Sequence, residues 1–83
     1  MASTECILAI DLGTSGCKSA LVDLTGKVLA WEFQEVPTLL FPDGGAEQCP
    51  EDWWNALVTT SRALVGRGIV PPESILAVCC STQ

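Results

Sequence analysis

Residues 9–18 read Ala-Ile-Asp-Leu-Gly-Thr-Ser-Gly-Cys-Lys, an apolar strand end followed by a glycine-framed turn. The apolar run at residues 6–10 that leads into the turn is typical of a short buried strand. Asp11 ends this run, and residues 13–16 carry the residue types that reverse the chain direction. Residues 18–23 then have small or apolar side chains in their middle, which predicts a second strand antiparallel to the first.

The segments that follow extend this hairpin into a sheet. Gly26 provides a turn, and residues 28–33 predict a third strand. Three strands joined by short turns form an antiparallel meander, in which we expect the first and least polar strand to lie innermost. Residues 34–48 contain two prolines and two glycines and predict a loop.

A helix is predicted to begin at Pro50, because proline suits the first helical position and acidic residues follow it in the first turn. Gly66 and Gly68 predict its end. Apolar residues recur at spacings of three and four, so we expect one face to pack on the sheet: Trp54, Leu57, Val58, Leu64 and Val65. The pattern assigns Trp54 to the core and leaves Trp53 for a partner domain or a ligand.

Residues 74–81 predict a final strand that pairs parallel with the first, since a crossover helix precedes it. The order is therefore β-β-β-loop-α-β, an α/β fold with a mixed sheet. This last strand has the composition of one buried on both faces, yet no second helix follows it to cover the sheet. We therefore expect residues 1–83 to be an incomplete domain.

Composition excludes several classes of function. Four basic and ten acidic residues give a net charge of −6, which would repel a phosphate backbone, so we expect no nucleic-acid partner. The longest apolar run, residues 75–80, is far shorter than the roughly 20 residues of a membrane-spanning helix. The N-terminal apolar run is also too short for a signal peptide, which predicts a cytoplasmic protein without a membrane span.

The five cysteines do not indicate a metal site or a disulfide framework. Their number is odd, and the chain has no histidine and no Cys-x-x-Cys pair. We expect Cys6, Cys79 and Cys80 to serve as small apolar residues in the strands that contain them.

The turn at residues 13–16 has the composition of a phosphate-binding loop. Its two glycines allow the backbone to approach a ligand closely and to adopt positive φ, so that consecutive N–H groups can converge on an anion. Thr14 and Ser15 add hydroxyl donors and Lys18 adds a positive charge. Asp11 suits the site if a hydrated Mg²⁺ lies between its carboxylate and the phosphates. An ordinary hairpin turn explains the same residues equally well.

Three segments taken together resemble the N-terminus of the FGGY carbohydrate kinases, and the xylulokinase branch most. They are residues 9–18, the Glu-Gln-x-Pro-x-x-Trp-Trp segment at 47–54, and residues 75–83. The resemblance implies a ribonuclease H-like, actin-like ATPase fold, of which residues 1–83 are part of the N-terminal domain. It also implies transfer of the γ-phosphoryl group of Mg-ATP to a hydroxyl of a sugar or polyol, most closely a xylulose-like pentulose.

The resemblance also implies roles for individual residues. Asp11 would hold Mg²⁺ through water, and Gln83 would lie next to the sugar. The catalytic aspartate would lie beyond residue 83, so the chain alone is expected to be inactive and to need the rest of the kinase as its partner. A homodimer is possible in this family. The cofactor ATP would be bound by one cluster of residues: Asp11, Gly13, Thr14, Ser15 and Lys18.

Two other hypotheses remain open at this point. Chaperone-type actin-like ATPases and ROK-type sugar kinases also begin with an Asp-x-Gly strand and hairpin, but they lack the segment at 47–54. The chain could instead be a small module that binds nucleotide or another protein without kinase activity. Binding of Mg-ATP would separate a phosphate site from a module without one.

Overall fold

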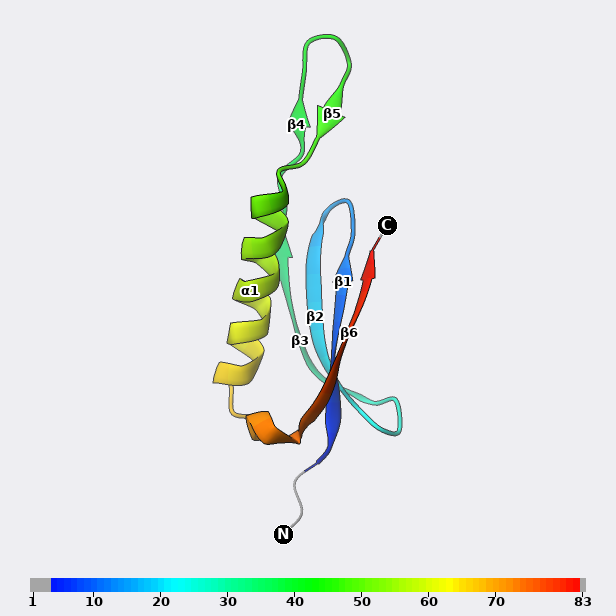
Figure 1. Cartoon of the computed structure of the whole chain (residues 1–83), viewed down its shortest axis with the longest axis vertical. Helices are drawn as coiled ribbons and strands as arrows, with labels where there is room; N and C mark the ends of the chain where they lie inside the picture. Colours follow the sequence, from blue (N-terminus) through cyan, green and yellow to red (C-terminus); the bar gives the residue numbers. More distant parts are fainter. Residues whose placement is uncertain (1–3, 83) are drawn as a thin grey trace.

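The computed structural model describes residues 4–82 (Figure 1). They form one main sheet with a helix on one face, and a short hairpin extends beyond the end of this sheet. The elements in chain order are β1 (Cys6–Leu12), β2 (Gly16–Asp23), β3 (Val28–Glu35), β4 (Leu39–Leu40), β5 (Ala46–Glu47), α1 (Pro50–Gly66), a 3-10 turn (Pro72–Ser74) and β6 (Ile75–Thr82). The predicted order of elements is confirmed. The predicted loop at 34–48 is wrong in one respect, because β4 and β5 pair within it.

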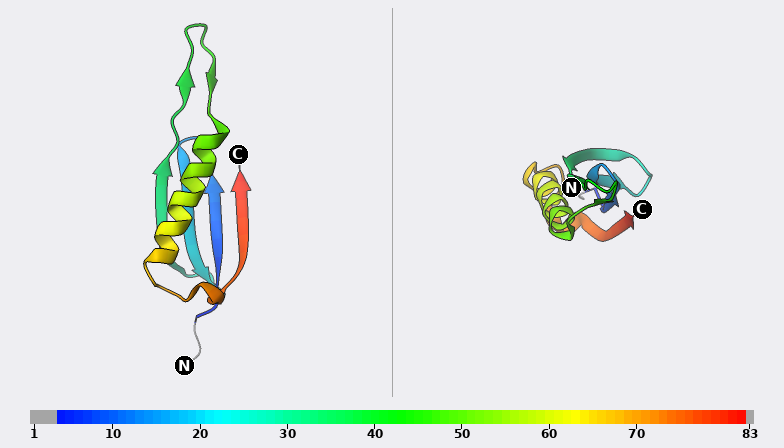
Figure 2. Two further views of the ribbon diagram at one scale, coloured as in Figure 1. Left: turned by 60° about the vertical axis from the view of Figure 1, so that its left-hand side comes forward. Right: turned by 90° about the horizontal axis from the view of Figure 1, so that it is seen from above.

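The main sheet has the strand order β3-β2-β1-β6. β1 pairs antiparallel with β2 and parallel with β6, so the sheet is mixed and β1 lies inside it as predicted. The connection from β3 to β6 runs through the β4–β5 hairpin and α1 (Figure 2). Within the described residues, no helix is long and apolar enough to cross a membrane.

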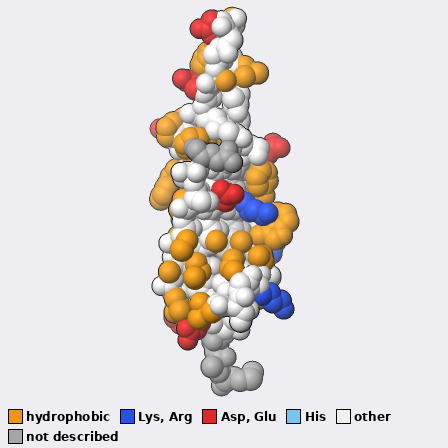
Figure 3. All heavy atoms as spheres, turned by 90° about the vertical axis from the view of Figure 1, so that its right-hand side faces the viewer, with side chains coloured by type: hydrophobic (Ala, Val, Ile, Leu, Met, Phe, Trp, Pro, Cys, Tyr) orange, Lys and Arg blue, Asp and Glu red, His pale blue; other side chains and the backbone are white. Residues whose placement is uncertain are grey.

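The core lies between α1 and one face of the sheet. Alternate residues of β1 and β2 point into it, which gives buried Leu8, Ile10 and Leu21. Their neighbours along β1, Ile7 and Ala9, are only half-buried, because the other face of the sheet carries no covering element among residues 4–82. This face holds part of the exposed apolar surface seen in Figure 3.

The stripe that the helix presents to the sheet agrees only in part with the predicted one, because Leu64 is buried and Leu57 packs against the core as predicted. Its buried residues are Ala56, Thr60 and Leu64, at a spacing of four. Trp54 is 64% exposed, so its predicted place in the core is wrong. The small side chains at positions 56 and 60 allow a close approach to β2, which the larger apolar residues would prevent.

β6 also differs from the prediction. Its sequence is typical of a strand buried on both faces, but Leu76 is 57% and Val78 is 62% exposed. The reason is that β6 forms the edge of the sheet and α1 packs on β2 and β3 instead. Cys79 and Cys80 are exposed for the same reason, whereas Cys6 and Cys17 are fully buried. Burial raises the pKa of the Cys6 thiol, which favours its uncharged form.

A buried hydrogen bond joins α1 to β2. The Thr60 hydroxyl donates to the Ala56 carbonyl at 2.9 Å, as helical threonines often do. Since a hydroxyl has one hydrogen, the Ser19 hydroxyl is the donor in its 2.7 Å bond to Thr60 Oγ1. Both residues are at most 2% exposed, and the Ser19 hydroxyl has Thr60 as its one side-chain partner within the described residues.

We predict strong coupling between these two residues. Thr60→Val leaves the buried Ser19 hydroxyl without its acceptor and should lower the free energy of unfolding by about 1–3 kcal/mol. Adding Ser19→Ala removes the hydroxyl that has lost its acceptor and should recover most of the lost free energy of unfolding, as measured by urea unfolding. Strictly additive effects of the two substitutions would contradict this account.

The turn between β2 and β3 is closed by Asp23. Its Oδ1 accepts hydrogen bonds from the backbone N–H and hydroxyl of Thr25 and from the backbone N–H of Lys27, at 2.6–2.9 Å. Gly26 adopts a φ of 93°, a conformation that favours glycine. These bonds, the Thr25 hydroxyl first among them, lower the pKa of Asp23 below the 3.8 that is ordinary for aspartate. The carboxylate therefore stabilises the folded state above its unfolded pKa, and this contribution is lost as the pH falls through the folded pKa.

We predict that Thr25→Val raises the pKa of Asp23 toward its ordinary value, because it removes the hydroxyl that lowers this pKa most. The two backbone donors remain, so the pKa should not rise fully to 3.8. Titration of the Asp23 carboxyl carbon by NMR measures both values. The same pKa in the two proteins would show that the hydroxyl bond contributes nothing.

Candidate functional site

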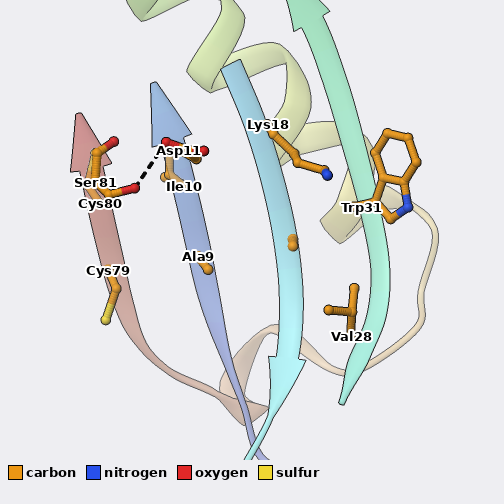
Figure 4. Close-up of a pocket in the computed structure, with 10 residues that line it drawn as sticks. Ala9, Ile10, Asp11, Lys18, Val28, Trp31, Cys79, Cys80 and Ser81 are labelled. Carbon is orange, nitrogen blue, oxygen red and sulfur yellow. Dashed lines mark hydrogen bonds between the residues drawn. The ribbon is translucent and has the colours of Figure 1, made fainter. Parts of the chain in front are cut away.

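The site lies at the carboxyl end of β1, where polar groups from three neighbouring strands meet. Asp11 of β1 is in register with Lys18 of β2 and with Ser81 of β6. The Ser81 hydroxyl donates to Asp11 Oδ1 at 3.0 Å (Figure 4). This bond holds the Asp11 carboxylate in place. Because Asp11 is exposed, the carboxylate remains open to a ligand or a hydrated ion.

The turn after β1 leaves unused backbone donors at this end of the sheet. The Gly13 N–H donates to the Gly16 carbonyl at 2.9 Å and closes the turn. Within residues 4–82, neither the Thr14 N–H nor the Ser15 N–H donates to a protein acceptor. Both residues are exposed. Free N–H groups on an exposed turn can bind an anion such as phosphate.

The backbone conformation of the two glycines of the turn differs from the one predicted. Neither Gly13 nor Gly16 has a positive φ, so the expectation of a left-handed conformation is wrong. Gly16 is needed because β3 lies against it. A Cβ atom there would come within 2.3 Å of the Gln34 carbonyl oxygen and 2.7 Å of Phe33 Cζ.

Lys18 supplies the positive charge on the same face of the sheet as Asp11. Its Nζ lies 4.8 Å from the centre of the Trp31 ring, within the range of a cation–π contact. Figure 4 shows the Lys18 side chain directed toward this ring. Trp31 could not be identified from local sequence patterns as a partner of Lys18, because the contact depends on the pairing of β2 with β3.

The structure brings the five predicted cofactor-binding residues together around one hollow, which Gly16, Trp31 and Phe33 also line: Asp11, Gly13, Thr14, Ser15 and Lys18. Gln83, predicted to lie near a sugar, falls outside the described residues. Ser81 joins the site through Asp11, as its register with that residue requires. Gln48 also contacts the turn, a contact that the sequence pattern does not indicate.

The predicted Mg²⁺ is compatible with these residues. Among residues 4–82, no three His, Cys, Asp or Glu side chains gather as a ligand set. Mg²⁺ needs no such set, because it commonly retains several waters and takes one or two carboxylates beside phosphate groups. Asp11 meets this need with one carboxylate next to the free N–H groups of the turn.

Comparison with known proteins gives a consistent match over nearly the whole chain. The sequence model for the N-terminal domain of the FGGY family of carbohydrate kinases matches residues 6–83. A glycerol kinase of Xanthobacter autotrophicus is 34% identical over 77 residues, which cover 93% of this chain and 16% of that protein. A xylulose kinase of Bacillus subtilis is 35% identical over 77 residues, which cover 93% of this chain and 15% of that protein.

Solved structures agree with these sequence matches. A xyloylose kinase from Brucella ovis superposes with a TM-score of 0.84 at 29% identity, over 95% of this chain and 16% of that one. A gluconate kinase from Lactobacillus acidophilus has a TM-score of 0.84 at 26% identity, over 96% of this chain and 16% of that one. The chain thus spans about a sixth of the length of these relatives, and its predicted fold class is confirmed. From the family match, the shared fold and the similar kinases, we conclude that this chain belongs to the FGGY family of carbohydrate kinases.

Proposed function

We propose that residues 1–83 are the N-terminal part of an ATP-dependent kinase that phosphorylates a hydroxyl of a sugar or polyol. The observation that carries this proposal is the hollow at the end of β1, which combines a carboxylate, two free backbone N–H groups and a lysine. These are the groups that a magnesium-bound polyphosphate needs. The family match supports the reaction class.

Each residue has a distinct task in this proposal. The N–H and hydroxyl groups of Thr14 and Ser15 donate to phosphate oxygens, and Lys18 balances their negative charge. Asp11 accepts hydrogen bonds from water bound to Mg²⁺, while the Ser81 hydroxyl fixes its orientation. Mg-ATP, when bound, supplies the phosphoryl group. The residues of this chain bind and orient it, which is the larger part of catalysis in phosphoryl transfer.

The acceptor that we propose is a xylulose-like pentulose, with glycerol as the alternative. Both a xylulose kinase and a glycerol kinase are among the similar proteins, at nearly equal identity. Gln83, the residue expected nearest the sugar, lies outside the described residues. A cytoplasmic location and a homodimer stay predictions from the sequence.

A kinetic experiment on the full-length protein tests the proposal. We expect D-xylulose or glycerol to stimulate ADP formation from Mg-ATP. Asp11→Asn should then lower kcat/KM for Mg-ATP by about 100-fold or more, since the interaction with the hydrated ion is worth several kcal/mol.

The matched control is Asp43→Asn in the β4–β5 hairpin, which retains a side-chain oxygen for the Gly45 N–H. It should leave the kinetics unchanged. Full activity of Asp11→Asn would contradict the proposed site, and no stimulation by any sugar or polyol would contradict the proposed function.

The isolated chain of 83 residues should not turn over substrate. Phosphoryl transfer needs groups placed on both sides of the phosphate and the acceptor. We propose that this chain provides the groups on one side. A coupled ADP assay on residues 1–83 with Mg-ATP and either acceptor checks this. Turnover above the rate of the Asp11→Asn chain would show that the catalytic groups lie within these residues.

A further inference from the structure

Gln48 is the one side chain of residues 4–82 that hydrogen-bonds to the backbone of the turn at residues 13–16. Its Nε2 donates to the Thr14 carbonyl at 2.7 Å and lies 3.3 Å from both the Val36 carbonyl and Thr38 Oγ1. Its Oε1 accepts from Trp53 Nε1 at 3.1 Å. Gln48 therefore ties the turn to the segment after β3 and to the first turn of α1.

The orientation of the Gln48 amide follows from the chemistry of its partners. An indole N–H can only donate, so Trp53 must face the amide oxygen. Carbonyl oxygens can only accept, so Thr14 and Val36 must face the amide nitrogen. The opposite orientation would lose three of these bonds, and the shortest of them is the one to Thr14.

This bond fixes the direction of a free donor in the candidate site. In a planar trans peptide, the carbonyl of Thr14 and the N–H of Ser15 point in opposite directions. Because Gln48 holds the Thr14 carbonyl on its own side, the Ser15 N–H points to the other side. Thr14 borders both the hollow beside Gln48 and the hollow lined by Asp11 and Lys18, whereas Ser15 borders only the second.

A second bond holds the next peptide in the same way. The Val36 N–H donates to the Ser15 carbonyl at 3.1 Å. The carbonyls of Thr14 and Ser15 are therefore engaged by Gln48 and Val36, and the Ser15 N–H remains free. A turn whose carbonyls are held in this manner does not need to reorganise when an anion binds, which lowers the free-energy cost of binding.

We infer that Gln48 is a positioning residue that aims the Ser15 N–H at the phosphate groups of the nucleotide, and that Trp53 holds Gln48 for this task. The inference rests on the proposed function, because it needs a phosphate at the hollow beside Asp11 and Lys18. It gives the Glu-Gln-x-Pro-x-x-Trp-Trp segment a role in the site that is separate from starting the helix.

Steady-state kinetics of the full-length protein tests this inference. Gln48→Met keeps the length of the side chain but removes its donors, and should raise the KM for Mg-ATP about tenfold with a change of less than about twofold in the KM for the sugar. Trp53→Phe removes the bond to Oε1 but leaves the donors of Nε2 in place, and should give a smaller rise. Gln34→Met is the matched control, because the side-chain amide of Gln34 bonds only to the adjacent Glu35 carbonyl within the described residues, and it should leave both KM values unchanged.

The possible outcomes separate the two proposals. If the unmodified protein has no sugar-dependent ATPase activity, the proposed function fails and the inference fails with it. If that protein is active and Gln48→Met lowers only the melting temperature, Gln48 is a structural residue and the inference alone is overturned. Gln48→Glu is a second test variant, because it keeps an acceptor for Trp53 but places a carboxylate against the Thr14 carbonyl. It should also raise the KM for Mg-ATP. Failure of both Gln48 variants to fold would also assign a purely structural role and overturn the inference.

Discussion

The position of β1 between β2 and β6 is the constraint on which the fold and the site both depend. Its antiparallel register with β2 places Asp11 beside Lys18, and its parallel register with β6 places Asp11 beside Ser81. A shift of one residue in either pairing would send these side chains to the opposite face of the sheet. The same alternation buries Leu8 and Ile10 against α1. The core and the site therefore occupy opposite faces of the same strand, and the register that builds one also builds the other.

The close packing of β3 on the first turn is the second requirement. A side chain at position 16 would collide with the backbone of Gln34, so the hairpin and β3 can only meet if this residue is glycine. Once they meet, the Val36 N–H reaches the Ser15 carbonyl and Gln48 reaches the Thr14 carbonyl. The turn is thus shaped by contacts from outside it, and its free N–H groups are left for a ligand.

The sequence predicted those features that depend on neighbouring residues. The order of strands, the start of α1 at Pro50 and the cluster from Asp11 to Lys18 follow from local patterns, and the structure agrees with them. Features that depend on side-chain contacts between distant segments could not be predicted. The side of α1 that is buried depends on its packing against β2, and the contact of Gln48 with Thr14 joins residues 34 positions apart. Glycine at position 16 is required by the approach of β3 and not by its φ.

The central claim is that the turn after β1, together with Asp11, binds the phosphates of Mg-ATP. A crystal structure of the full-length protein with Mg²⁺ and a non-hydrolysable ATP analogue tests it most directly. The account predicts phosphate oxygens within hydrogen-bonding distance of the Thr14 and Ser15 N–H groups, and a Mg²⁺-bound water on the Asp11 carboxylate. Phosphates bound elsewhere, with the turn and Asp11 untouched, would contradict it.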